Sequence, residues 1–131
     1  MHTITIGSKF EEMTEVESLI DKVCAELNWG DENYGNVLIA VTEAVNNAII
    51  HGNQKQGERK VKVEAKREQN AIIFSVTDEG KGFDFGSIPD PTAPENIEKP
   101  DGRGIFLMKS LSDGVEFENG GSKVNIAFSA Q

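Results

Sequence analysis

Hydrophobic and polar positions repeat with two different periods along this chain. At the N-terminus the segment HTITI alternates briefly, which predicts a short edge strand. Apolar residues then recur every three or four positions over residues 10–27, and again from about residue 32 to residue 51. This spacing is typical of helices with one buried face. The first half of the chain therefore predicts a strand followed by two helices.

Polar residues and glycines mark where these helices are expected to begin and end. Ser8 and Glu11 have the spacing of a capping box at the start of the first helix. Gly30 can serve as its C-terminal glycine, and Asp31 can cap the next helix. Gly52 follows the second helix and is expected to stop it.

The period changes to two in the second half of the chain. KVKVEAKRE (60–68) and AIIFSVTDE (71–79) alternate, and the intervening QN predicts a hairpin turn. Residues 80–102 are rich in glycine and contain all four prolines, which argue against regular helix or a central strand. GIFLMKSLSD (104–113) then predicts a short helix, and VEFENGGSKVNIAFS (115–129) a closing hairpin.

The order β-α-α-β-β-loop-α-β-β predicts an α+β two-layer sandwich. Strands joined by tight turns indicate a mostly antiparallel or mixed sheet, and three helices would cover one of its faces. With 131 residues and no evident linker, we expect one domain over residues 1–131. The loop from about Gly82 to Asp101 is longer than usual connections, so we expect a mobile lid over a ligand.

Charge and composition exclude several functions. The formal net charge of −9 opposes direct binding to DNA or RNA, and no basic cluster with aromatic neighbours is present. No apolar run reaches the length of a membrane span, and the N-terminus has no export signal, so a cytoplasmic location is expected. Cys24 is the only cysteine and falls on an apolar helix face, which predicts a small core residue.

Three polar residues share one file of the second expected helix. Glu43, Asn47 and His51 recur every fourth residue, on the flank of the apolar arc formed by residues such as Val41 and Val45. A half-buried carboxylate is costly unless it has a partner. Taken alone, this file is better explained by an ordinary solvated helix side.

Two later segments change that interpretation. In TDEGKGFD, Asp78 ends an apolar strand, where a carboxylate can accept a hydrogen bond from an exocyclic amine such as that of adenine. Gly80 and Gly82 would allow the backbone close to a flat ring or a phosphate. In DGRGIFLMKSL, Gly102 and Gly104 stand where a helix begins, and a helix N-terminus can bind phosphate. Together with the polar file, these segments indicate a nucleotide site.

The three segments, in this order, resemble the GHKL ATPase superfamily. EAVNNAIIH is similar to its N box, DEGKGF to its first glycine box, and GRGIFLMKSLSD to its second. GGSKVNI is similar to the last box, with Ser122 where threonine is more usual. The short length, the short lid and GRGIFLMKSL most resemble the anti-sigma-factor serine/threonine kinases.

This resemblance implies the Bergerat ATP-binding fold and a set of roles. Asn47 would be a Mg²⁺ ligand, Glu43 the general base or the group that positions the attacking hydroxyl, and Asp78 the acceptor for the adenine amine. The further expected nucleotide contacts are His51, without a definite role, Gly80 and Gly82 at the pocket wall, Gly102, Arg103 and Gly104 at the β- and γ-phosphates, and Ser122 in the last box.

The implied function is an ATP- and Mg²⁺-dependent protein serine/threonine kinase that acts as an anti-sigma factor. It would phosphorylate an anti-anti-sigma (STAS-type) protein, sequester a sigma factor and form a homodimer. Three alternatives remain open at this point: a histidine-kinase-like catalytic module, a plain ATPase and a non-catalytic ATP-binding regulator. Fold alone does not decide among them.

Overall fold

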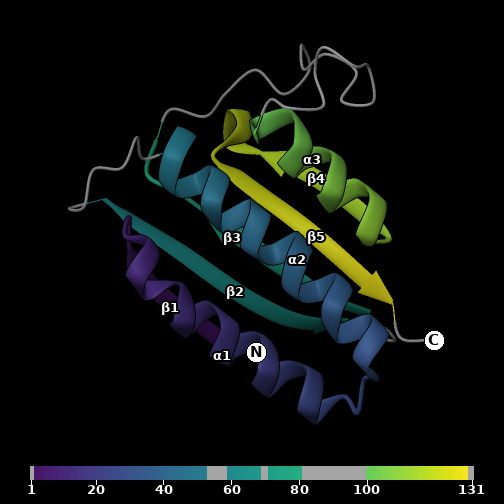
Figure 1. Cartoon of the computed structure of the whole chain (residues 1–131). Coiled ribbons are helices and arrows are strands. Elements are labelled where there is room, and N and C mark those ends of the chain that lie inside the picture. Colours follow the sequence, from purple (N-terminus) through teal and green to yellow (C-terminus); the bar gives the residue numbers. More distant parts are fainter. Residues whose placement is uncertain (1, 53–58, 69–70, 81–99, 130–131) are drawn as a thin grey trace.

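The computed structural model describes residues 2–52, 59–68, 71–80 and 100–129 as two layers, a sheet and the helices that cover one of its faces (Figure 1). The elements in chain order are β1 (His2–Gly7), η1 (Phe10–Glu12), α1 (Met13–Glu26), α2 (Asp31–Asn47), η2 (Ala48–Gly52), β2 (Lys60–Glu68), β3 (Ala71–Thr77), α3 (Pro100–Leu111), β4 (Gly114–Glu118), η4 (Asn119–Gly121) and β5 (Lys123–Ser129). The predicted α+β sandwich is confirmed.

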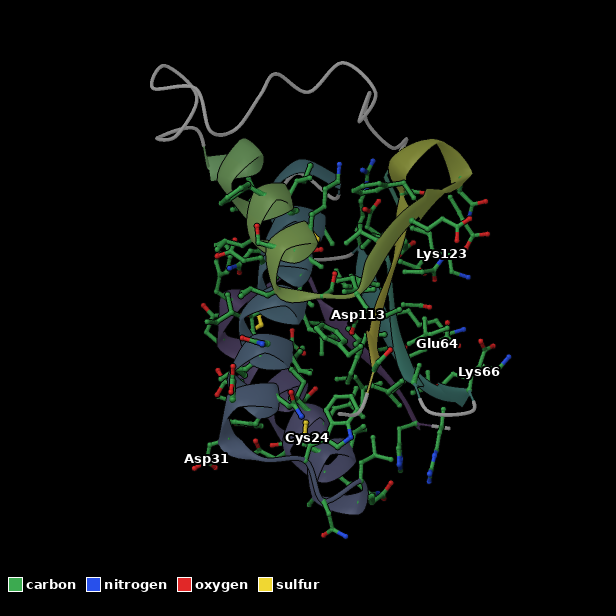
Figure 2. The ribbon with its side chains drawn as sticks, turned by 90° about the vertical axis from the view of Figure 1, so that its right-hand side faces the viewer. Cys24, Asp31, Glu64, Lys66, Asp113 and Lys123 are labelled. Atoms are coloured by element: carbon green, nitrogen blue, oxygen red, sulfur yellow. The ribbon has the colours of Figure 1, made fainter. Side chains whose placement is uncertain are left out.

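The five strands form one antiparallel sheet in the order β1-β2-β3-β5-β4. Burial alternates along β2, β3 and β5, because every second side chain points toward the helices. The opposite face is polar, and Glu64, Lys66 and Lys123 project from it, away from the helices (Figure 2). The predicted edge position of β1 is confirmed, whereas the expected QN turn lies outside the described residues.

The core lies between the sheet and helices α1, α2 and α3. Phe74 and Phe128, from neighbouring strands, pack edge to face with ring centroids 6.1 Å apart. Cys24 of α1 is buried among the apolar side chains, as predicted, and burial together with the nearby Asp21 raises the pKa of its thiol. No helix within the described ranges is both long and apolar enough to cross a lipid bilayer.

The first helix begins differently from the prediction. The N-cap residue of the first helical segment is Lys9 and not Ser8. The Ser8 hydroxyl instead donates to the carbonyl oxygen of Arg59 at 2.9 Å, and Glu12 accepts a hydrogen bond from the Gly7 N–H at 3.1 Å. The hydroxyl is therefore used to join the start of the helical layer to the chain just before β2.

The end of α1 is formed by Asn28 rather than by Gly30. Asn28 adopts a left-handed conformation with φ 56°, its N–H bonds the carbonyl of Ala25, and the Trp29 N–H bonds that of Cys24. These are the two hydrogen bonds of a Schellman motif. Gly30 is the N-cap residue of α2, and Asp31 is the first residue inside that helix.

Helix α3 begins earlier than predicted. It starts at Pro100, so Gly102 and Gly104 lie inside its first turns rather than before it, and it ends at Leu111. The expectation that Pro100 excludes helix was wrong because proline at the first helical position has no N–H that needs a partner. Most of the expected lid, residues 81–99, lies outside the described part of the chain.

Candidate nucleotide-binding site

The polar residues of α2 lie against α3. Glu43 and Asn47 are half-buried on the flank of the helix, while the predicted apolar arc, which includes Val41 and Val45, is buried against the sheet. Gly104 of α3 faces them. A methyl group on Gly104 would lie 3.1 Å from Glu43 Oε2, 3.1 Å from Asn47 Nδ2 and 3.5 Å from Asn47 Oδ1. Glu43 and Asn47 are one turn apart on α2, and Gly104 comes 57 positions after Asn47 in the sequence. The fold thus brings all three residues together.

His51 does not continue this file with regular α-helical geometry. The α-helix ends at Asn47, not at His51 as predicted, and residues Ala48–Gly52 form a π-helical turn. A π turn is wider than an α turn and shifts the angular positions of the residues after it. The backbone of His51 lies in this turn, and its side chain is outside the described part of the structure.

Asp78 follows the last residue of β3 and is held in place through its own backbone and side chain. Its N–H donates to the carbonyl oxygen of Ser122 at 2.9 Å, and its Oδ1 accepts the Gly80 N–H at 2.7 Å. Burial raises the pKa of the Asp78 carboxyl, an effect partly opposed by the Gly80 N–H and the positive charge of Arg59. The carboxylate is therefore a partly desolvated hydrogen-bond acceptor at the end of a strand.

Ser122 is buried at the start of β5, directly opposite this strand end. Its hydroxyl donates to the carbonyl oxygen of Asn119 at 3.1 Å. Asn119 and Gly121, in the short η4 turn before it, have φ of 54° and 106°. Left-handed backbone is accessible to glycine and tolerated by asparagine, so this turn is set by its sequence. The turn positions the carbonyl oxygen of Ser122, which accepts the hydrogen bond from the Asp78 N–H.

Asn47, Asp78 and Ser122 line one pocket. Apolar side chains form much of the rest of its wall, among them Val76, Met108 and Phe117. Small-molecule sites commonly combine an apolar wall with a few polar groups that fix orientation. The pocket thus has the composition of a small-molecule site, with the Asp78 carboxylate as a hydrogen-bond acceptor in its wall.

Met108 and Phe117 were not among the residues predicted from the sequence to form the site. Met108 lies one turn after Gly104 on α3, and Phe117 is on the inward face of β4. Both positions follow from the helical period and the strand alternation. What the sequence did not indicate is that α3 and β4 close over the same pocket as Asp78.

The other predicted contacts are described only in part. The Gly80 backbone is in place, with its N–H bound to Asp78. The backbones of Gly102 and Arg103 belong to the first turn of α3, but the Arg103 side chain and the whole of Gly82 lie outside the described part. Their expected contacts with phosphates remain predictions.

The amide oxygen of Asn47 would suit a hard divalent cation. Carboxylate and amide oxygens are preferred by Mg²⁺, which protein sites typically hold through one or two such ligands together with substrate phosphates. Within the described residues there is no group of three or more His, Cys, Asp or Glu side chains that would bind a metal unaided. The donor set therefore fits a magnesium ion that is bound together with a nucleotide.

Comparison with known proteins agrees with this arrangement. The sequence pattern of the histidine kinase-like ATPase domain family matches residues 6–128. The chain belongs to this family. The match extends from the end of β1 into β5 and so includes α2, Asp78, α3 and Ser122.

Several relatives of this chain are named anti-sigma F factor or serine-protein kinase. The chain is 31% identical over 99 residues to an anti-sigma F factor of Clostridium botulinum, covering 72% of this chain and 68% of the relative. It is 33% identical over 119 residues to an anti-sigma F factor of Clostridium acetobutylicum, covering 85% and 81%. It is 26% identical over 121 residues to the serine-protein kinase RsbW of Halalkalibacterium halodurans, covering 88% and 74%.

A solved structure has the same fold. The crystal structure of the RsbU and RsbW domains of a Mycobacterium tuberculosis protein matches 99% of this chain with a TM-score of 0.64 and 15% sequence identity. This chain spans 31% of that longer protein chain. At this identity the match shows the fold and not the activity.

Proposed function

We propose that this chain is an ATP- and Mg²⁺-dependent protein serine/threonine kinase of the anti-sigma-factor type. It phosphorylates an anti-anti-sigma (STAS-type) protein and sequesters a sigma factor, acting in the cytoplasm as a homodimer. The observation that carries the proposal is the meeting of Gly104 with Glu43 and Asn47 beside the pocket that Asp78 lines. The relatives named as anti-sigma factors and serine-protein kinases support it.

The pocket is proposed to hold the adenine ring. The Asp78 carboxylate accepts a hydrogen bond from the exocyclic amine, and the side chains of Met108 and Phe117 contact the ring. Gly80 and Gly82 form part of the wall, and Ser122 lies at its inner side and positions Asp78 through the main-chain hydrogen bond. Burial removes water from around the carboxylate, and a hydrogen bond from the ring amine would replace that lost partner.

The phosphates are proposed to lie between α2 and the first turns of α3. Gly102, Arg103 and Gly104 contact the β- and γ-phosphates, and His51 lies near them. Asn47 holds the magnesium ion, which neutralises phosphate charge when it is bound. Gly104 has no side chain, so the backbone of α3 can approach Glu43 and Asn47 closely.

Glu43 is proposed to act on the protein substrate. Its carboxylate accepts the proton of the attacking serine or threonine hydroxyl, or orients that hydroxyl toward the γ-phosphorus. A new bond forms between the hydroxyl oxygen and phosphorus, the bond to the ADP leaving oxygen breaks, and the proton passes to the base. Positioning and charge stabilisation contribute most of the rate in such transfers.

The decisive experiment is a transfer assay with the anti-anti-sigma protein of the same organism. The full chain is incubated with Mg-ATP and this protein, with EDTA added in a parallel reaction. We expect an acid-stable phosphate on serine or threonine of the partner, detected by mass spectrometry, and none with EDTA. Release of inorganic phosphate alone would indicate an ATPase, and acid-labile phosphohistidine would indicate a histidine kinase; either result would contradict the proposal.

A further inference from the structure

An open apolar groove runs along the outer side of the helical layer, between the start of the first helical segment and α2. These elements lie side by side over the sheet (Figure 1). The groove is lined by Phe10, Met13 and Glu17 from η1 and α1, and by Leu38, Ile39 and Thr42 from α2. It is separate from the nucleotide pocket, with which it shares no lining residue.

Two large apolar side chains in this groove are unusually accessible. Phe10 is 46% exposed and Ile39 is 44% exposed, and among the described residues only Phe106 of α3 is a comparable exposed large apolar side chain. Single exposed apolar residues are ordinary, but two that line one groove with Met13 and Leu38 form a continuous apolar surface. Covering such a surface with apolar groups of a partner lowers the free energy of the system.

The polar group of Thr42 does not interrupt this surface. Its hydroxyl donates to the carbonyl oxygen of Leu38 at 2.7 Å and lies 3.1 Å from that of Ile39. The hydroxyl is therefore satisfied within α2 and requires no hydrogen bond from a ligand. Farther along α1 and α2 the Tyr34 hydroxyl bonds the Asp21 carboxylate, which joins the two helices there.

The chain segment that supplies the lining residues of the groove carries most of the net charge of the protein. Residues 10–47 contain nine carboxylates and one lysine, a net charge of −8, whereas the whole chain has −9. Glu17 lines the groove itself, and α2 contains no basic residue. The groove is therefore an apolar surface that includes one carboxylate and belongs to a strongly acidic pair of helices.

We propose that this groove binds a positively charged amphipathic helix of a protein partner. Apolar side chains at helical spacing would cover Phe10 and Ile39, and lysine or arginine residues on either side would face the surrounding carboxylates. A second copy of this chain is a poor occupant, because it would bring two segments of net charge −8 together. The inference rests on the proposed function only in requiring a protein partner, and does not depend on phosphoryl transfer.

The groove and the nucleotide site are on neighbouring faces of one helix. Thr42 of the groove is adjacent in sequence to Glu43, and Asn46, which also lines the groove, is adjacent to Asn47. On an α-helix consecutive residues are separated by about 100°. A partner in the groove would thus lie beside the side chains of the site without obstructing the pocket.

The test uses a synthetic helical peptide with leucines on one face and lysines on the other as probe. Its affinity for the full chain is measured by calorimetry, and backbone NMR shifts locate the contact. We expect Phe10→Ser and Ile39→Ser each to weaken binding by about tenfold, as loss of an apolar anchor does. Glu17→Gln should weaken it less and reduce its dependence on salt.

The matched controls are Phe106→Ser, which removes an exposed aromatic outside the groove, and Glu116→Gln on the open face of the sheet. Equal weakening by Phe106→Ser or Glu116→Gln would show non-specific attraction and overturn the proposal. Conversion of a dimer to a monomer by Phe10→Ser would assign the groove to a second copy and also overturn it. Mg-ADP binding by the same variants is measured separately, so failure of the kinase proposal leaves this result interpretable.

Discussion

One flank of α2 carries Glu43 and Asn47, half-buried beside α3, while another carries Leu38 and Ile39 beside an open groove. In an ordinary amphipathic helix the polar side chains face water and the apolar ones are covered. Here a polar flank is covered and an apolar flank is open. Both arrangements cost stability in the isolated chain. The proposed nucleotide would complete the first surface, and the proposed helical partner the second.

The largest effect is expected from Glu43→Ala on the covered flank. Loss of a general base should reduce phosphate transfer to the partner by about 10²–10⁴-fold and leave Mg-nucleotide affinity nearly unchanged. Single-turnover transfer and calorimetric binding measure the two quantities. Glu32→Ala, at the exposed start of the same helix, is the control and should transfer at the wild-type rate. Wild-type transfer by Glu43→Ala would refute its proposed role.

Asn47→Ala should weaken nucleotide binding, whereas Glu43→Ala should slow phosphate transfer. Loss of an oxygen ligand should weaken the Mg²⁺-dependent part of nucleotide affinity by at least about tenfold, since even residues that only support a ligand contribute that much. Affinity for ADP is measured with Mg²⁺ and with EDTA. If both affinities fall by the same factor, Asn47 contacts the nucleotide or supports the fold and does not hold the metal.

Two helix glycines give a smaller but sharper comparison. Gly35 of α2 has open space where a methyl group would lie, so Gly35→Ala should stabilise the fold by about 0.5–1 kcal/mol. In Gly104→Ala the same gain is opposed by crowding against Glu43 and Asn47, which costs about 1–3 kcal/mol. Thermal melts should show higher stability for Gly35→Ala and no gain for Gly104→Ala. Mg-ADP should bind more weakly to Gly104→Ala. A stabilised Gly104→Ala with normal affinity would show that α3 need not approach so closely.

The smallest effect concerns Asp78, on the strand end that faces α2 across the pocket. Because burial raises its pKa, protonated Asp78 favours the fold at low pH, and this contribution is lost as pH rises through the folded-state pKa. Asp78→Asn keeps an acceptor for the Gly80 N–H and removes this dependence. The variant should therefore melt slightly above wild type at pH 7, with the difference shrinking toward pH 3.5, yet bind ADP more weakly. Equal ADP affinity would make Asp78 a turn residue only.

The sequence predicted the order of elements and the layer architecture because periods of 3.6 and 2 report directly on burial. It did not predict the helix ends correctly, because these depend on local competition. Asn28 rather than Gly30 ends α1, Pro100 begins α3, and the Ser8 hydroxyl binds Arg59, 51 residues away, instead of capping a helix. Hydrogen bonds between distant segments leave no mark in a local pattern.

The site was predictable to a similar degree. Spacing indicated that Glu43 and Asn47 share a helix flank, and glycines marked the segment near Gly104, but only the fold shows that Gly104 faces both. His51 was expected to continue the file, and the π turn from Ala48 changes the geometry before it. Met108 and Phe117 carry no motif, since apolar side chains in a pocket wall look like core residues in the sequence.

The uneven distribution of charge has a consequence for kinetics. Residues 10–47 hold a net charge of −8, while β2 on the sheet has a net charge of +2, because its four basic residues are partly offset by Glu64 and Glu68. The charge is therefore unevenly distributed, and the proposed cationic partner would be drawn to the helical side before contact. Such steering raises association rates well above those of neutral pairs and declines steeply with ionic strength. Capture of the partner would thus be fast in dilute salt, while the lifetime of the complex would depend mainly on the apolar contacts.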